Sequence, residues 1–265
     1  MRPGDEHTVV PFLPIRRAYV DVLDAGRRKN LMHAFVQYDV TAPRAAIAEA
    51  VARGEARPSF TAFIAHCVAT AVSEHPRVQA YRRRRRLIVF DDVDINMQVE
   101  TPHAGQQIVR SIILRGVQRM SVAEITETIR SAQDDAASTP DRHDARYRGT
   151  RAFVAVPRPI RGLVWRVALA NPFWFKRFGG TVGLSAVGMF GTSGGWGLVI
   201  TPPSLMVTVG GIDRMPRFVD GRVDEREMLA VTISFDHAVV DGAPAARFVA
   251  RLGELVAASD GLIGT

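Results

Sequence analysis

Cysteine is almost absent from this sequence of 265 residues, which contains Cys67 alone. A single thiol excludes a scaffold held together by disulfides and is typical of a reducing compartment. The first residues, with Asp5, Glu6 and His7 ahead of any apolar run, lack the basic and apolar regions of a signal peptide. We therefore expect a cytoplasmic protein. With 47% hydrophobic residues, the chain is also too apolar to be disordered.

Lysine is nearly as scarce, because Lys29 and Lys176 are the only two. Arginine therefore carries the net charge of +7, and Arg82–Arg86 and residues 141–180 together supply more than all of it. The run Arg82–Arg86 has no interleaved aromatic residues, so it does not indicate nucleic-acid binding. We expect this run to form a solvated strand edge or turn. Phosphate binding is the alternative, because the forked arginine side chain matches phosphate geometry.

Charge of either sign is missing from Phe178 to Ile212. The stretch is long enough to cross a bilayer as a helix. However, it contains ten glycines and the pair Pro202–Pro203, and residues of these types break helices. We interpret it as buried strands joined by tight turns.

The remaining patterns predict a mixture of helices and strands. Helices are expected over 41–54 with Thr41 as N-cap, from Ser59 to Pro76, from Ser121 with a capping box to Glu124, and after Pro244. Strands are expected over 87–100, 107–114, 205–212 and 228–235, with a hairpin turn at 219–222. Helices and strands do not alternate regularly. We therefore expect one α/β domain over residues 1–265, a mixed two-layer sandwich with helices packed on one face of the sheet.

The segment from Ser234 to Phe248 carries the clearest chemical signal. In it His237 leaves the end of a strand, the turn Asp241–Gly242 follows, and a helix begins. A histidine at such a boundary is accessible, and its ordinary pKa of about 6.5 suits a general base. Taken alone, the spacing His-x-x-x-Asp-Gly is more often structural, so the surrounding sequence decides its interpretation.

The surrounding sequence resembles the dihydrolipoyl acyltransferase family, the catalytic core of 2-oxo acid dehydrogenase complexes. That family shares its fold with chloramphenicol acetyltransferase. The resemblance covers nearly the whole chain, in the right order. Its matching elements are Pro14–Arg17, Ala34–Thr41, Phe60–Phe63 through His75–Pro76, Gly179–Ser185, Pro202–Pro203, Val209–Gly210 and the His237 segment.

The resemblance implies roles for five residues of this sequence. His237 would be the general base that takes the proton from an acceptor thiol, and Ser185 would donate a hydrogen bond to the oxyanion. Asp241, with Gly242 beside it, would hold the turn that carries His237. Arg16 would pair with Asp241, and an Arg16 that faces solvent is the alternative.

The resemblance also implies substrates and partners. Coenzyme A would carry the acyl group, no metal would take part, and the site would lie between the subunits of a homotrimer or a larger trimer-based assembly. Neither lysine has the context of a lipoylated residue, so a lipoyl group would come only from another protein. Two alternatives stay open. One is a catalytically silent trimeric scaffold or assembly subunit, and the other is an acyltransferase for a non-lipoyl small-molecule acceptor.

Two departures from the family pattern stand out. A basic and aromatic insert occupies about residues 141–178 and ends in Pro172, Phe173, Trp174 and Phe175. We expect this insert to pack against the trimer and reshape the channel mouth, and association with a membrane surface is the alternative. Ala238 replaces the arginine that usually follows the histidine, which favours the silent alternative.

Overall fold

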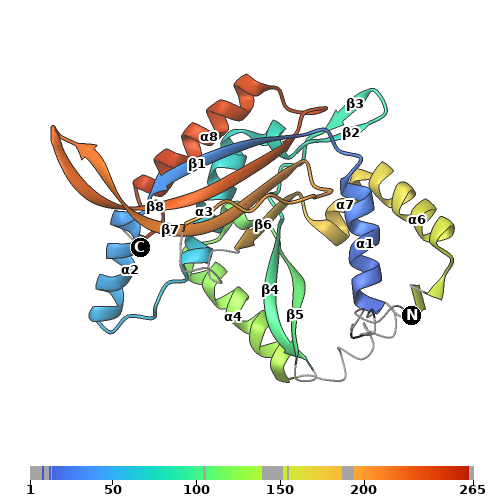
Figure 1. Cartoon of the computed structure of the whole chain (residues 1–265), viewed down its shortest axis with the longest axis horizontal. Helices are drawn as coiled ribbons and strands as arrows, with labels where there is room; N and C mark the ends of the chain where they lie inside the picture. The colour runs from blue at the N-terminus through green and yellow to red at the C-terminus, as the bar shows by residue number, and fades with distance from the viewer. Residues whose placement is uncertain are drawn as a thin grey trace, which may run out of the picture.

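The computed structural model describes residues 8, 12, 14–103, 106–138, 152–153, 155–186 and 194–262. A six-stranded sheet in the order β1-β8-β7-β6-β4-β5 forms its centre (Figure 1). The strands are β1 Leu31–Asp39, β4 Ile95–His103, β5 Gln106–Leu114, β6 Val182–Ala186, β7 Leu205–Val219 and β8 Arg222–Asp236. The helices are α1 Pro14–Gly26, α2 Thr41–Ala52, α3 Phe60–Glu74, α4 Val122–Ser138, α6 Arg158–Ala170, α7 Pro172–Gly179 and α8 Gly242–Ala257. The chain also forms a separate hairpin of β2 Tyr81–Arg83 and β3 Arg86–Ile88, and the 3-10 helices η1 Pro76–Gln79 and η2 Val117–Arg119.

The sheet is mixed and is covered by helices on one face. β6 runs parallel to β4 and β7, whereas β1, β5 and β8 run antiparallel to their neighbours. Helices α3, α4 and α8 pack on the sheet through side chains such as Phe63, Ile125 and Phe248, which are fully buried. The expected α/β sandwich with helices on one face is confirmed.

The inner strands are buried on both faces. Residues 182–185, 205–211 and 228–236 are all buried, so the charge-free stretch includes the two buried strands that its composition predicts. Part of the connection before β7 lies over the face opposite the helices. There the Gly211 N–H donates to the Gly195 carbonyl at 3.2 Å, and Trp196 Nε1 donates to the Val36 carbonyl at 3.2 Å.

Several local signals act as the sequence predicts. Ser59 Oγ accepts a backbone N–H at the start of α3, and Ser121 and Glu124 form the capping box of α4. The turn between β7 and β8 places Asp220 and Gly221 at φ angles of 48° and 78°. Two successive residues in this left-handed region are typical of a two-residue hairpin turn.

Two predicted boundaries are wrong. Val40, rather than Thr41, is the N-cap of α2. The Thr41 hydroxyl instead accepts the Glu227 N–H at 2.9 Å and ties the helix to β8. The strand expected over 87–100 is the end of β3 and the start of β4. The aspartates between them form side-chain contacts with a neighbouring loop, which is a turn pattern rather than a strand pattern.

Helices α1, α6 and α7 lie together at one side of the sheet, on the right in Figure 1. The β2–β3 hairpin packs beside α7 through Tyr81 and Phe175, whose ring centroids are 5.2 Å apart. Arg82–Arg86 are exposed around its turn, so the predicted solvated turn is confirmed. Within the insert, residues 141–151 and 154 lie outside the described residues. None of the helices described is long and apolar enough to cross a membrane.

Candidate active site

His237 is fixed by its backbone and open at its side chain. It follows β8 directly, and its N–H donates to the Asn30 carbonyl at 2.7 Å. Its side chain is 54% exposed. The end of the strand therefore fixes the position of the His237 backbone. Its exposed imidazole ring remains accessible to a substrate or a second chain.

Asp236 shapes the turn that carries His237. Its Oδ1 accepts the Ala238 N–H at 3.1 Å, and its carbonyl accepts the Val239 N–H at 2.9 Å. The sequence contains a signal for this role, because an aspartate ahead of a turn often bonds the backbone two residues on. Asp236 thus holds this turn within one chain, and the holding role expected of Asp241 stays a prediction.

Lys29 is the partner of Asp236. Its Nζ lies 2.6 Å from Asp236 Oδ2, and both side chains are largely buried. The ammonium group also lies 5.5 Å from the centroid of the Tyr81 ring. Nothing in the sequence points to this pair, because Lys29 and Asp236 are 207 positions apart.

Asp241 lies near His237 but makes few contacts. Its Oδ1 is 3.9 Å from His237 Nδ1, and its side chain is 89% exposed. Gly242 begins α8, and a Cβ at that position would meet nothing within 4 Å. Arg16 is exposed on α1, and among the described contacts of Asp241 there is no ion pair with Arg16. The expected roles of these three residues therefore stay predictions for an assembled site.

Ser185 lies in the middle of the sheet, on the face opposite the helices. Leu184 belongs to the helix-covered core, so the next side chain along the strand points the other way. Ser185 is buried and pairs in register with Thr208 of β7, which in turn pairs with Thr232 of β8. Three hydroxyl side chains thus form a row across the sheet.

The two threonines of this row are unsatisfied. Thr208 Oγ1 and Thr232 Oγ1 are buried without a hydrogen-bond partner in the part of the chain that the structure describes. A buried hydroxyl without a partner costs about 1–3 kcal/mol, and these two lie in one row with Ser185, so this part of the sheet offers hydrogen-bonding groups to a ligand. Sequence reasoning missed both residues, because threonine is common in strands and neither stands in a recognisable motif.

Ser185 and His237 of one chain do not meet. Asp236 lies four residues along β8 from Thr232, about 13 Å, and the hydroxyl row spans two strand spacings, about 10 Å. The Cα atoms of Ser185 and Asp236 are therefore about 16 Å apart. A site that uses both side chains requires His237 from one chain and Ser185 from another.

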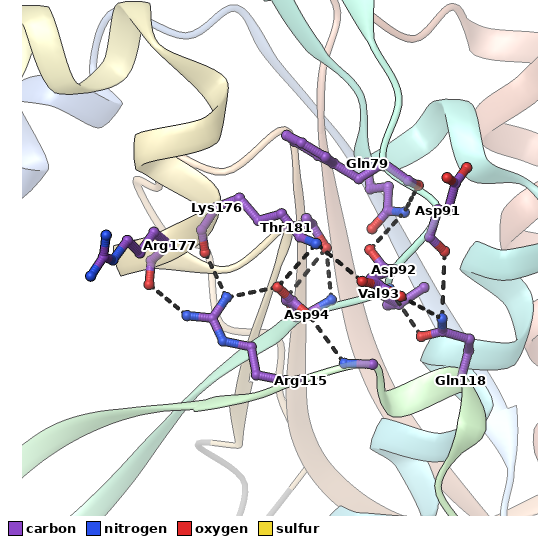
Figure 2. Close-up of polar contacts among 12 residues, drawn as sticks. Gln79, Asp91, Asp92, Val93, Asp94, Arg115, Gln118, Lys176, Arg177 and Thr181 are labelled. Carbon is purple, nitrogen blue, oxygen red and sulfur yellow. Dashed lines mark hydrogen bonds and ion pairs between the residues drawn. The ribbon is translucent and has the colours of Figure 1, made fainter.

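A polar cluster around Asp94 fixes the start of β6 (Figure 2). The buried Asp94 carboxylate accepts Arg115 Nη1 at 2.7 Å, and the Thr181 N–H donates to the Asp94 carbonyl at 2.7 Å. Gly180 has a φ of 70°, and a Cβ there would lie 2.6 Å from the Asp94 carbonyl oxygen. Glycine is therefore required at this position. The residues that lead into β6 and Ser185 are held against Asp94, which immediately precedes β4.

The same cluster holds the end of α7. Arg115 donates to the carbonyls of Lys176 and Arg177 at 2.8 and 2.5 Å, as Figure 2 shows. Lys176 Nζ lies 3.4 Å from Asp92 Oδ2 and 3.5 Å from Asp94 Oδ2. A cation at the carboxyl end of a helix is favourable because of the helix dipole. Helix α7 is thus docked directly onto the strands that position Ser185.

Other candidate groups have structural surroundings. Cys67 is buried in α3, where burial raises the pKa of its thiol, so it is a core residue as predicted. His33 Nδ1 lies 2.8 Å from Ser234 Oγ within the sheet. Among the described residues, no group of three His, Cys, Asp or Glu side chains could hold a metal ion.

Comparison with known proteins places these residues in a family. The model of the 2-oxoacid dehydrogenases acyltransferase (catalytic domain) family matches residues 4–144 and 177–263. The dihydrolipoyllysine-residue acetyltransferase component of the pyruvate dehydrogenase complex of Acholeplasma laidlawii is 28% identical over 201 residues, which is 75% of this chain and 30% of that protein. The lipoamide acyltransferase component of the branched-chain alpha-keto acid dehydrogenase complex of Bacillus subtilis is 22% identical over 264 residues, which is 97% of this chain and 53% of that protein. The chain therefore spans about a third to a half of the length of these relatives.

Solved structures share the fold. The dihydrolipoamide acetyltransferase of Azotobacter vinelandii superimposes with a TM-score of 0.71 at 20% identity, covering 100% of this chain and 99% of that one. The cubic core of a pyruvate dehydrogenase multienzyme complex gives a TM-score of 0.70 at 20% identity, with coverage of 100% and 99%.

Residues 145–176, which include α6 and most of α7, lie between the two ranges that the family model matches. The chain belongs to the 2-oxoacid dehydrogenase acyltransferase family, through its catalytic domain.

Proposed function

We propose that the chain transfers an acyl group between a thioester and an acceptor thiol, with His237 as general base and Ser185 as oxyanion donor. The observation that carries this proposal is the placement of His237, whose backbone is held while its imidazole stays open. Membership of an acyltransferase family supports acyl transfer in general. We propose coenzyme A and a dihydrolipoyl group on another protein as the two carriers.

The chemistry needs one proton acceptor and one hydrogen-bond donor. His237 takes the proton from the acceptor thiol, and the thiolate forms a bond to the thioester carbonyl carbon. The carbonyl oxygen becomes an oxyanion, to which the Ser185 hydroxyl donates a hydrogen bond. When the carbonyl reforms, the bond to the original sulfur breaks, and the leaving thiolate takes the proton back from the imidazolium group of His237.

We propose a trimer because the site needs residues from two chains. The distance between Ser185 and His237 within one chain supports this arrangement. Among the described strands, β1 is at the edge of the sheet and has β8 as its one neighbour, so we expect its outer side to contact another chain. Beside it, Phe35 and Trp196 are exposed and stack edge to face with ring centroids 6.4 Å apart, and exposed aromatic residues of this kind are common in subunit contacts.

The proposal is tested with acetyl coenzyme A and free dihydrolipoamide, by measuring formation of the new thioester. We expect His237→Ala to lower kcat by about 10²–10⁴-fold, because the base is lost. Ser185→Ala should lower kcat by about 10²–10³-fold, the typical cost of one oxyanion donor. His75→Gln, a change at a half-buried histidine at the end of α3, is the matched control and should keep the wild-type rate.

Equal rates for the wild type and His237→Ala would refute the catalytic role and support the silent scaffold. A rate with small alcohols or amines, and none with thiols, would instead support a non-lipoyl acceptor. Both outcomes require that the variants keep the circular dichroism spectrum and the molecular mass of the wild type.

A further inference from the structure

Helix α6 turns its apolar side away from the protein. Four side chains at helical spacing are between 47% and 57% exposed: Ile160, Leu163, Val164 and Val167. On the opposite side, which faces α1, the buried Arg161 donates to both carboxylate oxygens of Asp21, at 2.7 and 3.3 Å. A surface helix normally buries its apolar stripe and exposes its charges. In α6 four apolar side chains lie outward instead, and the charged Arg161 lies inward.

Helix α7, which contacts α6, adds exposed aromatic residues. Phe173, Trp174 and Phe178 are between 53% and 71% exposed, while Phe175 is buried against Tyr81. We define the α6–α7 apolar face by its seven exposed side chains: Ile160, Leu163, Val164, Val167, Phe173, Trp174 and Phe178. Aromatic residues beside aliphatic ones are typical of side chains that lie at the boundary between lipid and water.

The charged residues of this segment itself are all basic. The described residues 155–186 contain four arginines and one lysine and no acidic residue. Arg158, Arg161 and Lys176 are paired with aspartates. Arg166 and Arg177 have no ion pair in the described part of the chain, and the same is true of Arg82–Arg86 in the hairpin beside α7. The surface is therefore apolar at its centre and cationic around it.

We propose that the α6–α7 apolar face binds the surface of an anionic lipid bilayer. The apolar side chains would enter the headgroup boundary, and the unpaired arginines would contact lipid phosphates. Helix α6 has 13 residues, about 20 Å, so it lies along the surface rather than crossing a hydrocarbon core of about 30 Å. A second copy of this chain on the same face would bring arginines against arginines, whereas anionic lipid supplies both the apolar and the negative groups.

Flotation with vesicles tests this proposal. We expect the wild type to bind vesicles of phosphatidylcholine with phosphatidylglycerol, and not vesicles of phosphatidylcholine alone. Added salt should weaken the binding, because it screens the arginines. Leu163→Glu/Val167→Glu should lower the bound fraction at least about tenfold, because it places charge on the inserted side. Arg83→Gln/Arg85→Gln should weaken partitioning by about fivefold for each arginine removed.

The hairpin between β7 and β8 offers a matched control. Phe218 and Val223 face each other across its strands and are 78% and 66% exposed. The end of this hairpin lies on the left in Figure 1, whereas α6 and α7 lie on the right. Phe218→Glu/Val223→Glu makes the same change in charge and should bind like the wild type. No binding of the wild type to anionic vesicles, or an equal loss in both glutamate variants, would overturn the proposal. A third outcome would also overturn it: the wild type does not bind vesicles, and the molecular mass of Leu163→Glu/Val167→Glu in light scattering differs from that of the wild type. The face would then join copies of the chain.

Discussion

At the scale of single residues, the turn that carries His237 depends on an ion pair between distant parts of the chain. Asp236 bonds the turn with one carboxylate oxygen and Lys29 with the other. Both side chains are largely buried, so loss of one partner leaves the other charge desolvated and unpaired. Under the proposed mechanism we therefore expect Lys29 to be a positioning residue, which acts on the reaction through the backbone of His237.

Asp236→Asn is expected to lower kcat by up to about 10²-fold with little change in KM, because a misplaced base affects the reacting geometry more than binding. Steady-state kinetics with acetyl coenzyme A separate the two constants. Lys29→Arg keeps the ion pair and should keep most of the rate, whereas Lys29→Met should resemble Asp236→Asn. A change confined to thermal stability, with kcat unaltered in both variants, would show that the pair only supports the fold.

Residue-level prediction from the sequence succeeds where a motif is local. The segment around His237 predicts an accessible histidine at the end of a strand, and the structure places His237 there. Lys29 and Thr208 carry no such signal, because their importance depends on which distant residues the fold brings beside them. The Thr208 hydroxyl is notable only once the register with Ser185 is known.

At the scale of elements, the starts of α3 and α4 were predictable because their capping signals are short-range. The Ser121 backbone N–H and then its hydroxyl hold the pKa of Glu124 below its usual range. Such a carboxylate stabilises the fold above its unfolded pKa, about 4.3. That contribution is lost as the pH falls through the lower, folded pKa.

We expect Glu124→Gln to be less stable than the wild type at neutral pH, and to match it at a pH below the folded pKa of Glu124. Urea unfolding followed by circular dichroism, repeated from neutral to acidic pH, measures the difference. Glu127→Gln, a change at an exposed residue of the same helix, is the control and should show no such trend. A stability difference that persists at the acidic end would assign the effect to packing rather than to charge.

Boundaries set by tertiary contacts were not predictable from local sequence. Thr41 has the side chain of an N-cap, yet its hydroxyl is used by the Glu227 N–H of a strand. Ile88 and Ile95 fall within one predicted strand but belong to different sheets, and the aspartates between them contact the loop around Gly116 and Arg119. In both cases the deciding partner lies far along the chain.

At the scale of the whole molecule, the proposed mechanism and the separation of Ser185 from His237 within one chain predict that catalysis depends on the assembly. Ser185→Ala chains and His237→Ala chains should each be nearly inactive alone. When the two are unfolded together, mixed equally and refolded, a ring with one kind of contact should regain about one quarter of the wild-type rate, because that share of contacts joins two intact residues. No recovery in mixed assemblies of confirmed composition would place both residues in one chain's site.

The fold class and the order of its elements could be predicted from the sequence, because the resemblance runs through nearly the whole chain. The position of the insert in the sequence could be predicted, but which of its side chains face the protein could not. Its composition shows arginines among apolar residues, and only the structure shows that Arg161 points inward to Asp21 while Leu163 points outward.

The pairing of both lysines has a practical consequence for chemical labelling. Lys29 is held by Asp236 and Lys176 by Asp92 and Asp94, and an ammonium group held in this way reacts slowly with acylating reagents. The rate at which each lysine amine is acylated therefore measures how often its own ion pair opens. Acylation of Lys29 records release of the His237 turn, and acylation of Lys176 records release of α7 from the strands beside Ser185. A mass spectrum after brief exposure to an amine-reactive ester thus measures acylation at Lys29 and at Lys176 in one sample.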